Sequence, residues 1–134
     1  MPTPDEMKAK IEALKKSGYR IDTAIHPGRI VVTWNGEVIA ESHRAVVLNE
    51  TRHAPVFYIP RADARMTVME RTLHTTHCPF KGDANYFSLV SGQSRAENAV
   101  WSYETPIPDC AAIAGHLAFY TKDMGANFGI EVKS

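Results

Sequence analysis

Asn35-Gly36 constrains the fold of this chain most, because it separates two runs of strand-forming residues, 29–34 and 37–41. Two-residue hairpin turns require positive φ at both central positions, and Asn and Gly adopt such angles at little cost. The pair therefore predicts a tight hairpin between two antiparallel strands. In the expected register six residues share one face of the hairpin: Ile30, Val32, Trp34, Glu37, Ile39 and Glu41.

The rest of the chain is divided into similarly short runs of strand-forming residues, separated by turns. Further strands are expected at 20–25, 45–50, 56–59, 86–90, 99–104, 117–121 and 129–132. Residues 61–64 and 110–114 are expected to form single helical turns, and 91–97 a polar loop. Short strands interrupted by turns are typical of antiparallel sheets, so we expect a mostly β (α+β) fold.

The first residues predict an amphipathic helix over 1–18. Thr3 is a suitable N-cap with Glu6 as its capping-box partner, and Pro4 occupies the first helical position. Gly18 is expected to end the helix in a left-handed cap. Apolar residues recur at helical spacing within it: Met7, Ile11 and Leu14. We expect this helix to pack on the sheets.

Length and charge exclude several classes of protein. With 134 residues and no repeat or linker, the chain is expected to form a single domain over 1–134. Fifteen basic and fifteen acidic side chains cancel, which argues against nucleic-acid binding through a basic face. No apolar run approaches the roughly 20 residues that cross a bilayer, and no signal core is present. With only two cysteines, we expect a cytoplasmic protein with free thiols.

Six motifs follow one another along the chain, and the most specific is Cys-Pro-Phe-Lys-Gly at 78–82. They lie at 34–42, 58–60, 76–82, 84–86, 101–103 and 118–120. In this order they resemble the bacterial family known as domain of unknown function 427, over residues 29–134. Members are sometimes labelled nucleotidyltransferase-like, but this chain lacks the Gly-Ser pair followed by paired aspartates that holds metal in such enzymes.

The resemblance implies a fold similar to the β-tent group, with two antiparallel sheets pinned at one edge and the helix at 1–18 outside the core. Several β-tent proteins carry zinc between two Cys-x-x-Cys knuckles. This chain has neither knuckle, so we expect no metal and no cofactor. Other proteins of the group hold a flat ligand in an aromatic cage, which makes the aromatic residues of this chain candidates for a pocket.

Cys78 is a candidate nucleophile. It lies three residues before Lys81, and a nearby ammonium favours the reactive thiolate. A nucleophilic cysteine also requires a base, which His74, His77 or His116 could supply. The plainer interpretation, which we favour, is a small buried apolar residue at the start of a strand.

Four side chains have the right chemistry for zinc: His74, His77, Cys78 and Cys110. Their spacing is poor, because His77 and Cys78 would point to opposite faces of an extended chain and Cys110 is distant. The histidines are therefore interpreted as polar loop residues. Lys81-Gly82 could instead hold an anion, with a tight turn and a solvated lysine as the open alternative.

Aromatic residues with polar tips predict a pocket. Trp101 and Tyr103 alternate along one strand and share a face, with Ser102 and Glu104 on the other. Tyrosines combine surface area with a hydrogen-bonding group, which suits a binding site. The expected ligand-binding residues are Arg44, Glu50, Tyr58, Thr76, Lys81, Tyr86, Trp101 and Tyr103. The alternative is an aromatic core. Arg44 and Glu50 are expected to form an ion pair.

Two functions follow from these residues. The first, which we prefer, is a binding domain for a small molecule in an aromatic and polar pocket. The second is an enzyme in which Cys78 or Lys81 acts on a small substrate, with Glu50 or a histidine as the base. The first is preferred because no complete set of nucleophile, base and orienting group can be recognised from spacing.

Overall fold

The computed structural model describes residues 5–6, 9, 12–13, 18–120 and 128–133. The strands of this part are β1 Ile21–Ile25, β2 Arg29–Trp34, β3 Glu37–Ser42, β4 Val46–Glu50, β5 Val56–Tyr58, β6 Met69–Cys78, β7 Gly82–Ser91, β8 Ser94–Ser102, β9 Ala118–Phe119 and β10 Phe128–Lys133. Short 3-10 helices lie at η1 Arg61–Asp63, η2 Met66–Val68 and η3 Pro108–Ile113. The mostly β fold predicted from the sequence is confirmed. The helix predicted over 1–18 falls largely outside the described residues and stays a prediction.

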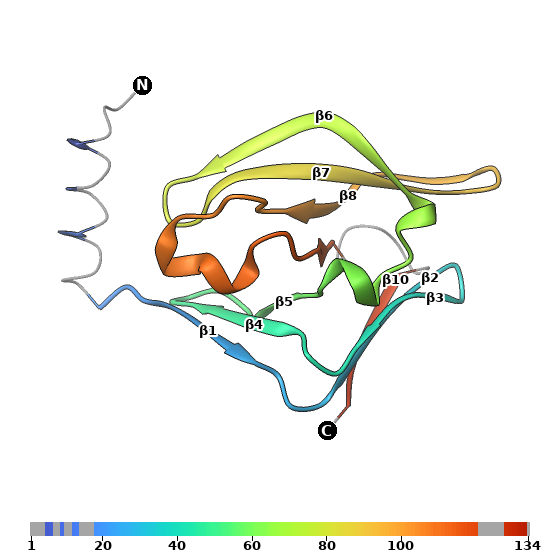
Figure 1. Cartoon of the computed structure of the whole chain (residues 1–134), viewed down its shortest axis with the longest axis horizontal. Coiled ribbons are helices and arrows are strands. Elements are labelled where there is room, and N and C mark those ends of the chain that lie inside the picture. Colours follow the sequence, from blue (N-terminus) through green and yellow to red (C-terminus); the bar gives the residue numbers. More distant parts are fainter. Residues whose placement is uncertain (1–4, 7–8, 10–11, 14–17, 121–127, 134) are drawn as a thin grey trace.

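The strands form three antiparallel sheets with the orders β1-β4-β5, β10-β2-β3 and β6-β7-β8-β9. Figure 1 shows the β6-β7-β8-β9 sheet above the β1-β4-β5 sheet, with the β10-β2-β3 sheet crossing at one end. At the other end, η3 lies between the two layers. Ile59 and Leu117 exchange backbone hydrogen bonds of 2.8 Å in both directions. This bridge holds the β5 side of one sheet against the β9 side of the other.

The predicted Asn35-Gly36 turn is confirmed, with φ of 53° and 80° at the two positions. The expected register is wrong beyond the turn, because the β2–β3 pairing shifts between Val32 and Thr33. Glu41 therefore pairs with Val31 and is exposed, instead of sharing the buried face. A bulge inserts one residue and reverses the side-chain parity of everything beyond it. The core consequently receives Ile39, Ala40 and Ser42 from β3.

No strand was expected at 69–78, where the structure has the ten-residue strand β6. Most of β6 is exposed, and it lies at the edge of its sheet. Its polar sequence lacks the alternation of apolar residues by which half-buried strands are recognised. The β6–β7 pairing also shifts between Arg71 and Thr75, and Leu73 in this stretch is 100% exposed.

The polar loop predicted at 91–97 is also wrong. β7 continues to Ser91, and β8 already begins at Ser94, so the connection is a tight turn with Gly92 at φ 58°. Both helical turns predicted at 61–64 and 110–114 are found, as η1 and η3.

Two hydrophobic clusters fill the interior, and the second one positions the site described below. The first cluster joins β2 and β3 to β7 and β8, and its large members include Ile30, Val32, Trp34, Ile39, Phe87, Leu89 and Val100. The second joins β4 and β5 to β7 and η3, and it contains Tyr58, Tyr86 and Tyr103. Tyrosine hydroxyls inside a protein require a hydrogen-bond partner or open space.

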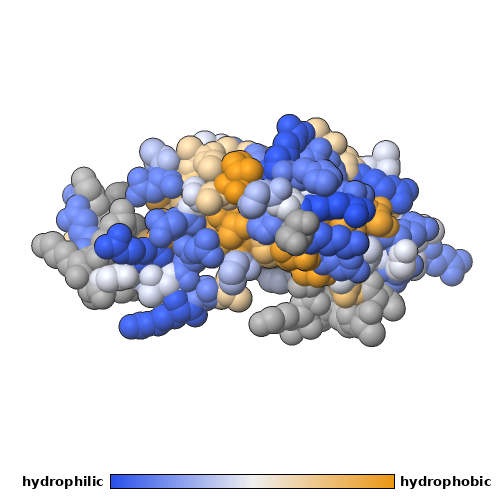
Figure 2. All heavy atoms as spheres, turned by 90° about the horizontal axis from the view of Figure 1, so that it is seen from below, coloured by the Kyte–Doolittle hydropathy of each residue, from blue (hydrophilic) through white to orange (hydrophobic). Residues whose placement is uncertain are grey.

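The surface seen from below in Figure 2 is mostly hydrophilic at its periphery, with hydrophobic residues gathered in the middle. Within the described part of the chain, no helix has the length and apolar character needed to cross a membrane.

Candidate functional site: an aromatic pocket between two sheets

A pocket of about 400 Å³ lies between β4–β5 and β7–β8 and is called the aromatic pocket below. It is lined by Leu48, Glu50, His53, Ala54, Val56, Tyr58, Cys78, Lys81, Tyr86, Trp101, Tyr103 and Tyr120. The structure thus brings together six of the expected site residues: Glu50, Tyr58, Lys81, Tyr86, Trp101 and Tyr103. Arg44 and Thr76 are not in the lining.

Strand register explains why the aromatic rings meet. Tyr86 on β7 lies directly opposite Trp101 on β8, and Trp101 lies opposite Ala118 on β9. Residues directly opposite one another share a face of the sheet, and Tyr120 follows Ala118 by the two residues that restore the same face. The ring centroids of Trp101 and Tyr120 are 4.4 Å apart.

Tyr58 reaches the same space from the other sheet. Its ring meets Trp101 edge-on at 6.4 Å, and its hydroxyl accepts a hydrogen bond of 3.3 Å from Trp101 Nε1. Burial raises the pKa of Tyr58, and burial together with a hydrogen bond to Tyr86 raises the pKa of Tyr120 to about 12. These phenols therefore stay neutral near pH 7 and act as hydrogen-bonding groups.

One ion pair supplies charge to the aromatic pocket. Lys81 Nζ donates to Glu50 Oε1 at 2.8 Å, and the side chains are only 13% and 11% exposed. Burial acts to lower the pKa of Lys81, but the hydrogen bond to Glu50 and the charge of nearby Cys78 outweigh it, so the pKa is raised. Lys81 is therefore an ammonium near neutral pH, and the idea of a solvated turn lysine is wrong.

The β6–β7 turn holds Lys81 in place. The backbone N–H of Lys81 donates to the carbonyl of Cys78, and the Lys81 carbonyl accepts from Ile107. Gly82 follows with φ of 118° and packs against the backbone of Pro106. A side chain at position 82 would be strained in that conformation, so the turn requires glycine directly after Lys81.

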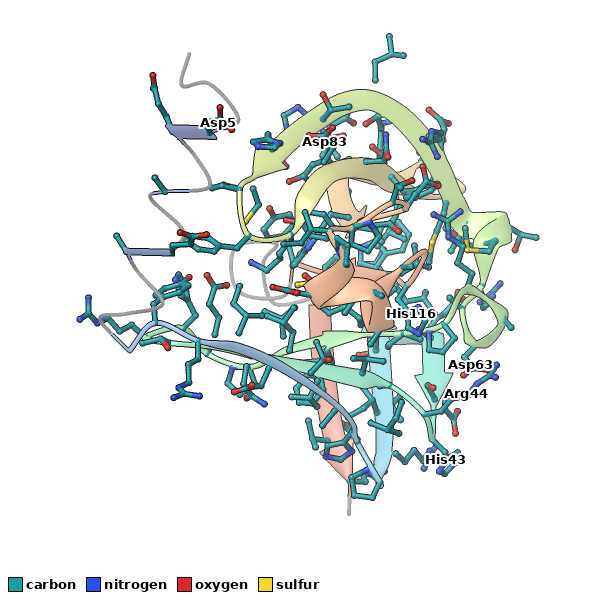
Figure 3. All side chains as sticks on the ribbon, turned by 60° about the vertical axis from the view of Figure 1, so that its left-hand side comes forward. Asp5, His43, Arg44, Asp63, Asp83 and His116 are labelled. Carbon is teal, nitrogen blue, oxygen red and sulfur yellow. The ribbon has the colours of Figure 1, made fainter. Side chains whose placement is uncertain are left out.

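Arg44 lies away from the aromatic pocket, and its expected pairing with Glu50 is wrong. Its guanidinium donates to Asp63 at 3.0 Å, and this contact lowers the pKa of Asp63. Figure 3 shows Arg44 beside Asp63, far from Asp83 in the β6–β7 hairpin. Arg44 precedes β4 and Glu50 ends it, and an extended strand of this length separates its first and last Cα atoms by roughly 13 Å.

Thr76 supports the site from outside. Its hydroxyl and that of Tyr86 are 3.0 Å apart and share a hydrogen bond, which fixes the tip of the Tyr86 ring. Thr76 itself lines a different concavity of about 580 Å³, with Thr75, His77, Asp83, Asn85, Glu104 and Thr105. That concavity is larger, but its charged members are already occupied with one another or with neighbouring arginines.

Cys78 opens into the aromatic pocket, with its Sγ 3.8 Å from Lys81 Nζ. The expected bases are elsewhere: His77 pairs with Asp83 at 2.6 Å, His74 packs on the Tyr86 ring at 4.5 Å, and His116 contacts the Ala114 carbonyl. The thiol is half-buried, so it is neither fully exposed nor sealed in the core.

The four side chains considered for zinc are not gathered. Cys110 is buried, and its Sγ lies 3.5 Å from the Phe80 carbonyl. Among the residues the structure describes, no group of three or more His, Cys, Asp and Glu side chains could hold a metal ion. Folding without zinc stays a prediction.

Sequence reasoning missed two polar members of the lining. His53 comes from the turn between β4 and β5, and its Nε2 lies 3.8 Å from Glu50 Oε2. No local pattern marks this residue. Tyr120, in the motif at 118–120, was recognised as an aromatic residue on a neighbouring strand but was not included among the expected ligand-binding residues.

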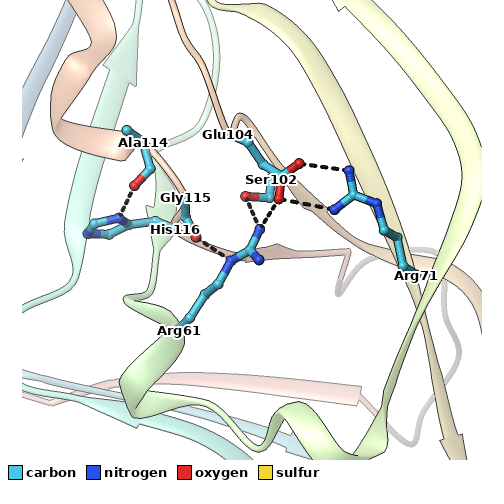
Figure 4. A network of polar contacts seen from close by, with 7 residues as sticks. All are labelled: Arg61, Arg71, Ser102, Glu104, Ala114, Gly115 and His116. Carbon is cyan, nitrogen blue, oxygen red and sulfur yellow. Dashed lines mark hydrogen bonds and ion pairs between the residues drawn. The ribbon is translucent and has the colours of Figure 1, made fainter.

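On the opposite face of the same segment, Ser102 and Glu104 belong to a second polar site, called the guanidinium cluster below (Figure 4). Arg61 donates to Ser102, to Glu104 at 2.8 Å and to the Gly115 carbonyl at 2.7 Å. Arg71 donates to both oxygens of Glu104, at 2.7 and 3.0 Å. Hydrogen bonds from Arg71 and then Arg61 outweigh burial and lower the pKa of Glu104 to about 2.

The model of a family described as a domain of unknown function (DUF427) matches residues 23–129. No curated protein matches the chain.

Proposed function

The chain belongs to the DUF427 family, and from this premise we propose that it binds a small planar molecule in the aromatic pocket. The observation that carries the proposal is the combination of aromatic walls with a shielded Lys81–Glu50 ion pair in one cavity. Small-molecule sites are mostly apolar concavities with a few placed polar groups. The volume of about 400 Å³ suits a molecule of one or two rings.

The shielded ion pair is difficult to explain by stability alone. Removing two charges from water costs several kcal/mol per ion, and an apolar pair of similar volume is often as stable. Within the aromatic pocket, Lys81 and Glu50 offer a donor and an acceptor to a ligand without adding net charge. This arrangement favours a neutral ligand with polar edges over a strongly charged one.

A second candidate function is an enzyme that uses Cys78. It is favoured by the 3.8 Å contact between Lys81 Nζ and Cys78 Sγ inside the aromatic pocket. Lys81 is the weaker candidate for nucleophile, because the raised pKa keeps its amine protonated. Glu50 is engaged by Lys81 and is not free to serve as a base.

Several finer expectations belong with this proposal. The two layers joined through Ile59 and Leu117 are consistent with a β-tent-like arrangement. We also propose a cytoplasmic domain whose partner is a small molecule and not a nucleic acid, since the net charge is zero.

The proposal is tested by titrating the protein with benzamide, benzoate and benzylamine, with binding followed by saturation-transfer NMR. Benzamide is expected to bind best. Trp101→Ala should weaken its binding by about tenfold or more, and more than Lys81→Ala, because ring stacking supplies most of the contact. Trp34→Phe is the matched control, since Trp34 lies in the first core cluster. Absence of binding by all three probes, or equal binding by Trp101→Ala, would contradict the proposal.

A further inference from the structure

The hydroxyl of Tyr103 has no hydrogen-bond partner among the described residues. The side chain is only 7% exposed, and its ring packs on Tyr58 with centroids 6.4 Å apart. In the described part of the chain no fully occluded side-chain polar atom lacks a partner. Tyr103 lines the aromatic pocket, so its hydroxyl keeps contact with that cavity. A donor left open inside a cavity points to an acceptor atom on a bound molecule.

Cys78 lines the same cavity as this phenol and lies beside the Lys81 ammonium. Its Sγ lies 3.8 Å from Lys81 Nζ. Nearby Cys78 also contributes to raising the pKa of Tyr103, after burial and Tyr58, which agrees with their proximity. A thiol thus shares one aromatic cavity with two proton donors.

We infer that the aromatic pocket captures small aromatic aldehydes by reversible addition of the Cys78 thiol, with the carbonyl oxygen held by the Tyr103 hydroxyl. The inference rests on the proposed function, because the ring of the aldehyde occupies the aromatic pocket. It assigns the nucleophile to Cys78 and the acceptor atom of the ligand to a carbonyl oxygen.

The addition balances without any further reactant. The Cys78 thiol gives its proton to solvent, its sulfur forms a bond to the carbonyl carbon, and the carbon–oxygen π bond breaks. The oxygen receives a hydrogen bond from Tyr103 and a proton from the Lys81 ammonium, and Lys81 then regains a proton from solvent. The product is a neutral hemithioacetal with the atoms of aldehyde plus thiol. Two donors aimed at a developing alkoxide favour a carbonyl electrophile over an alkyl one.

An aldehyde fits better than an ester. Hydrolysis of an acyl-enzyme requires a base that activates water. Glu50 is held by Lys81, and His77 is held by Asp83 outside the aromatic pocket. The remaining histidine of the lining, His53, lies with its Nε2 3.8 Å from Glu50 Oε2 and is directed at that carboxylate. Addition to an aldehyde needs no leaving group and no water, so these residues suffice.

The test uses 4-nitrobenzaldehyde labelled with ¹³C at the carbonyl, and 4-nitrobenzamide as its unreactive counterpart. In the wild type, ¹³C NMR is expected to show the aldehyde carbon converted to a tetrahedral carbon bonded to sulfur. Cys78→Ala should abolish that signal and still bind the amide, whereas Cys110→Ala should keep both. Tyr103→Phe should weaken adduct formation by about tenfold, the effect of one lost hydrogen bond to the oxygen of the adduct.

A second measurement avoids any dependence on variants. The wild type is labelled with iodoacetamide, with and without the aldehyde, and the modified peptides are quantified by mass spectrometry. The aldehyde should protect Cys78, and the buried Cys110 in the same sample gives the background.

The outcomes separate the two proposals. Binding of the amide without a tetrahedral adduct would overturn aldehyde capture and leave the proposed function standing. An imine carbon that disappears in Lys81→Met would assign the nucleophile to Lys81 and overturn the role of Cys78. Failure of both probes to bind would overturn the proposed function and aldehyde capture together.

Discussion

Residues 101–104 serve two polar sites of opposite character on the two faces of one segment. Trp101 and Tyr103 face the aromatic pocket, whereas Ser102 and Glu104 face the guanidinium cluster. Glu104 accepts from two arginines, and its carboxylate is fully engaged. Tyr103, one residue earlier, has a hydroxyl to which no described residue hydrogen-bonds.

This difference distinguishes polar groups that stabilise the fold from polar groups that are available to a ligand. In the guanidinium cluster, every charged group is hydrogen-bonded to a partner of opposite charge, and the side chains are about one-third to one-half exposed. In the aromatic pocket the ion pair is shielded, and donors remain open to a cavity. A saturated network joins strands together, whereas an unsaturated one is prepared to receive a ligand.

The largest effect on stability is expected from Lys81→Met. It leaves the Glu50 carboxylate shielded without a cation, which should lower the free energy of unfolding by about 3 kcal/mol. Arg71→Met in the more exposed guanidinium cluster is the matched change and should cost about 1 kcal/mol. Urea unfolding at pH 7 measures both. Equal losses of unfolding free energy in the two variants would contradict the proposed difference between the two sites.

Trp101→Ala should have the next largest effect and lower the free energy of unfolding by about 2 kcal/mol, because it removes the ring that contacts both Tyr58 and Tyr120. The ring is partly exposed, so the loss should stay below that of a fully buried tryptophan. Urea unfolding compared with Trp101→Phe, which keeps a ring, isolates the contribution of the larger indole. A loss below that of Glu104→Gln would show that the ring contributes little to the fold.

Glu104→Gln should lower the free energy of unfolding by about 1–2 kcal/mol at pH 7. The loss is no larger because solvent screens these partly exposed ion pairs. The pKa of Glu104 is lowered from its ordinary 4.5 to about 2. Its contribution is therefore complete above the unfolded pKa and is lost as the pH falls from about 4.5 to about 2. The difference in unfolding free energy between wild type and variant should narrow in that window. A difference independent of pH would contradict the assigned ion pairs.

Tyr103→Phe should have the smallest effect and lower the free energy of unfolding by less than about 0.5 kcal/mol, because the Tyr103 hydroxyl makes no hydrogen bond to a described residue. Tyr58→Phe is the control, since it removes the acceptor of the Trp101 N–H and should cost about 1 kcal/mol. Thermal and urea unfolding of the two variants give the comparison. A larger loss for Tyr103→Phe would mean that its hydroxyl is structural.

Much of the fold and part of the site were predictable from the sequence. The alternation at 101–104 correctly separated Trp101 and Tyr103 from Ser102 and Glu104, because parity in an extended strand depends on the backbone alone. The strand β6 was missed, since an exposed edge strand needs no apolar pattern. The prediction that Glu41 shares the buried face was wrong because a bulge reverses the side-chain parity of β3. No residue type near the bulge indicates its position.

Features that depend on neighbours along the chain could be predicted from the amino-acid sequence: the Asn35-Gly36 turn, the short antiparallel strands and the Lys81-Gly82 turn. Tertiary structure alone decided that Lys81 pairs with Glu50, 31 residues away, and that Arg44 pairs with Asp63. It also decided that the Tyr103 hydroxyl faces a cavity. Backbone preferences act over a few residues, whereas the partner of a charge or hydroxyl depends on which strands the sheets bring together.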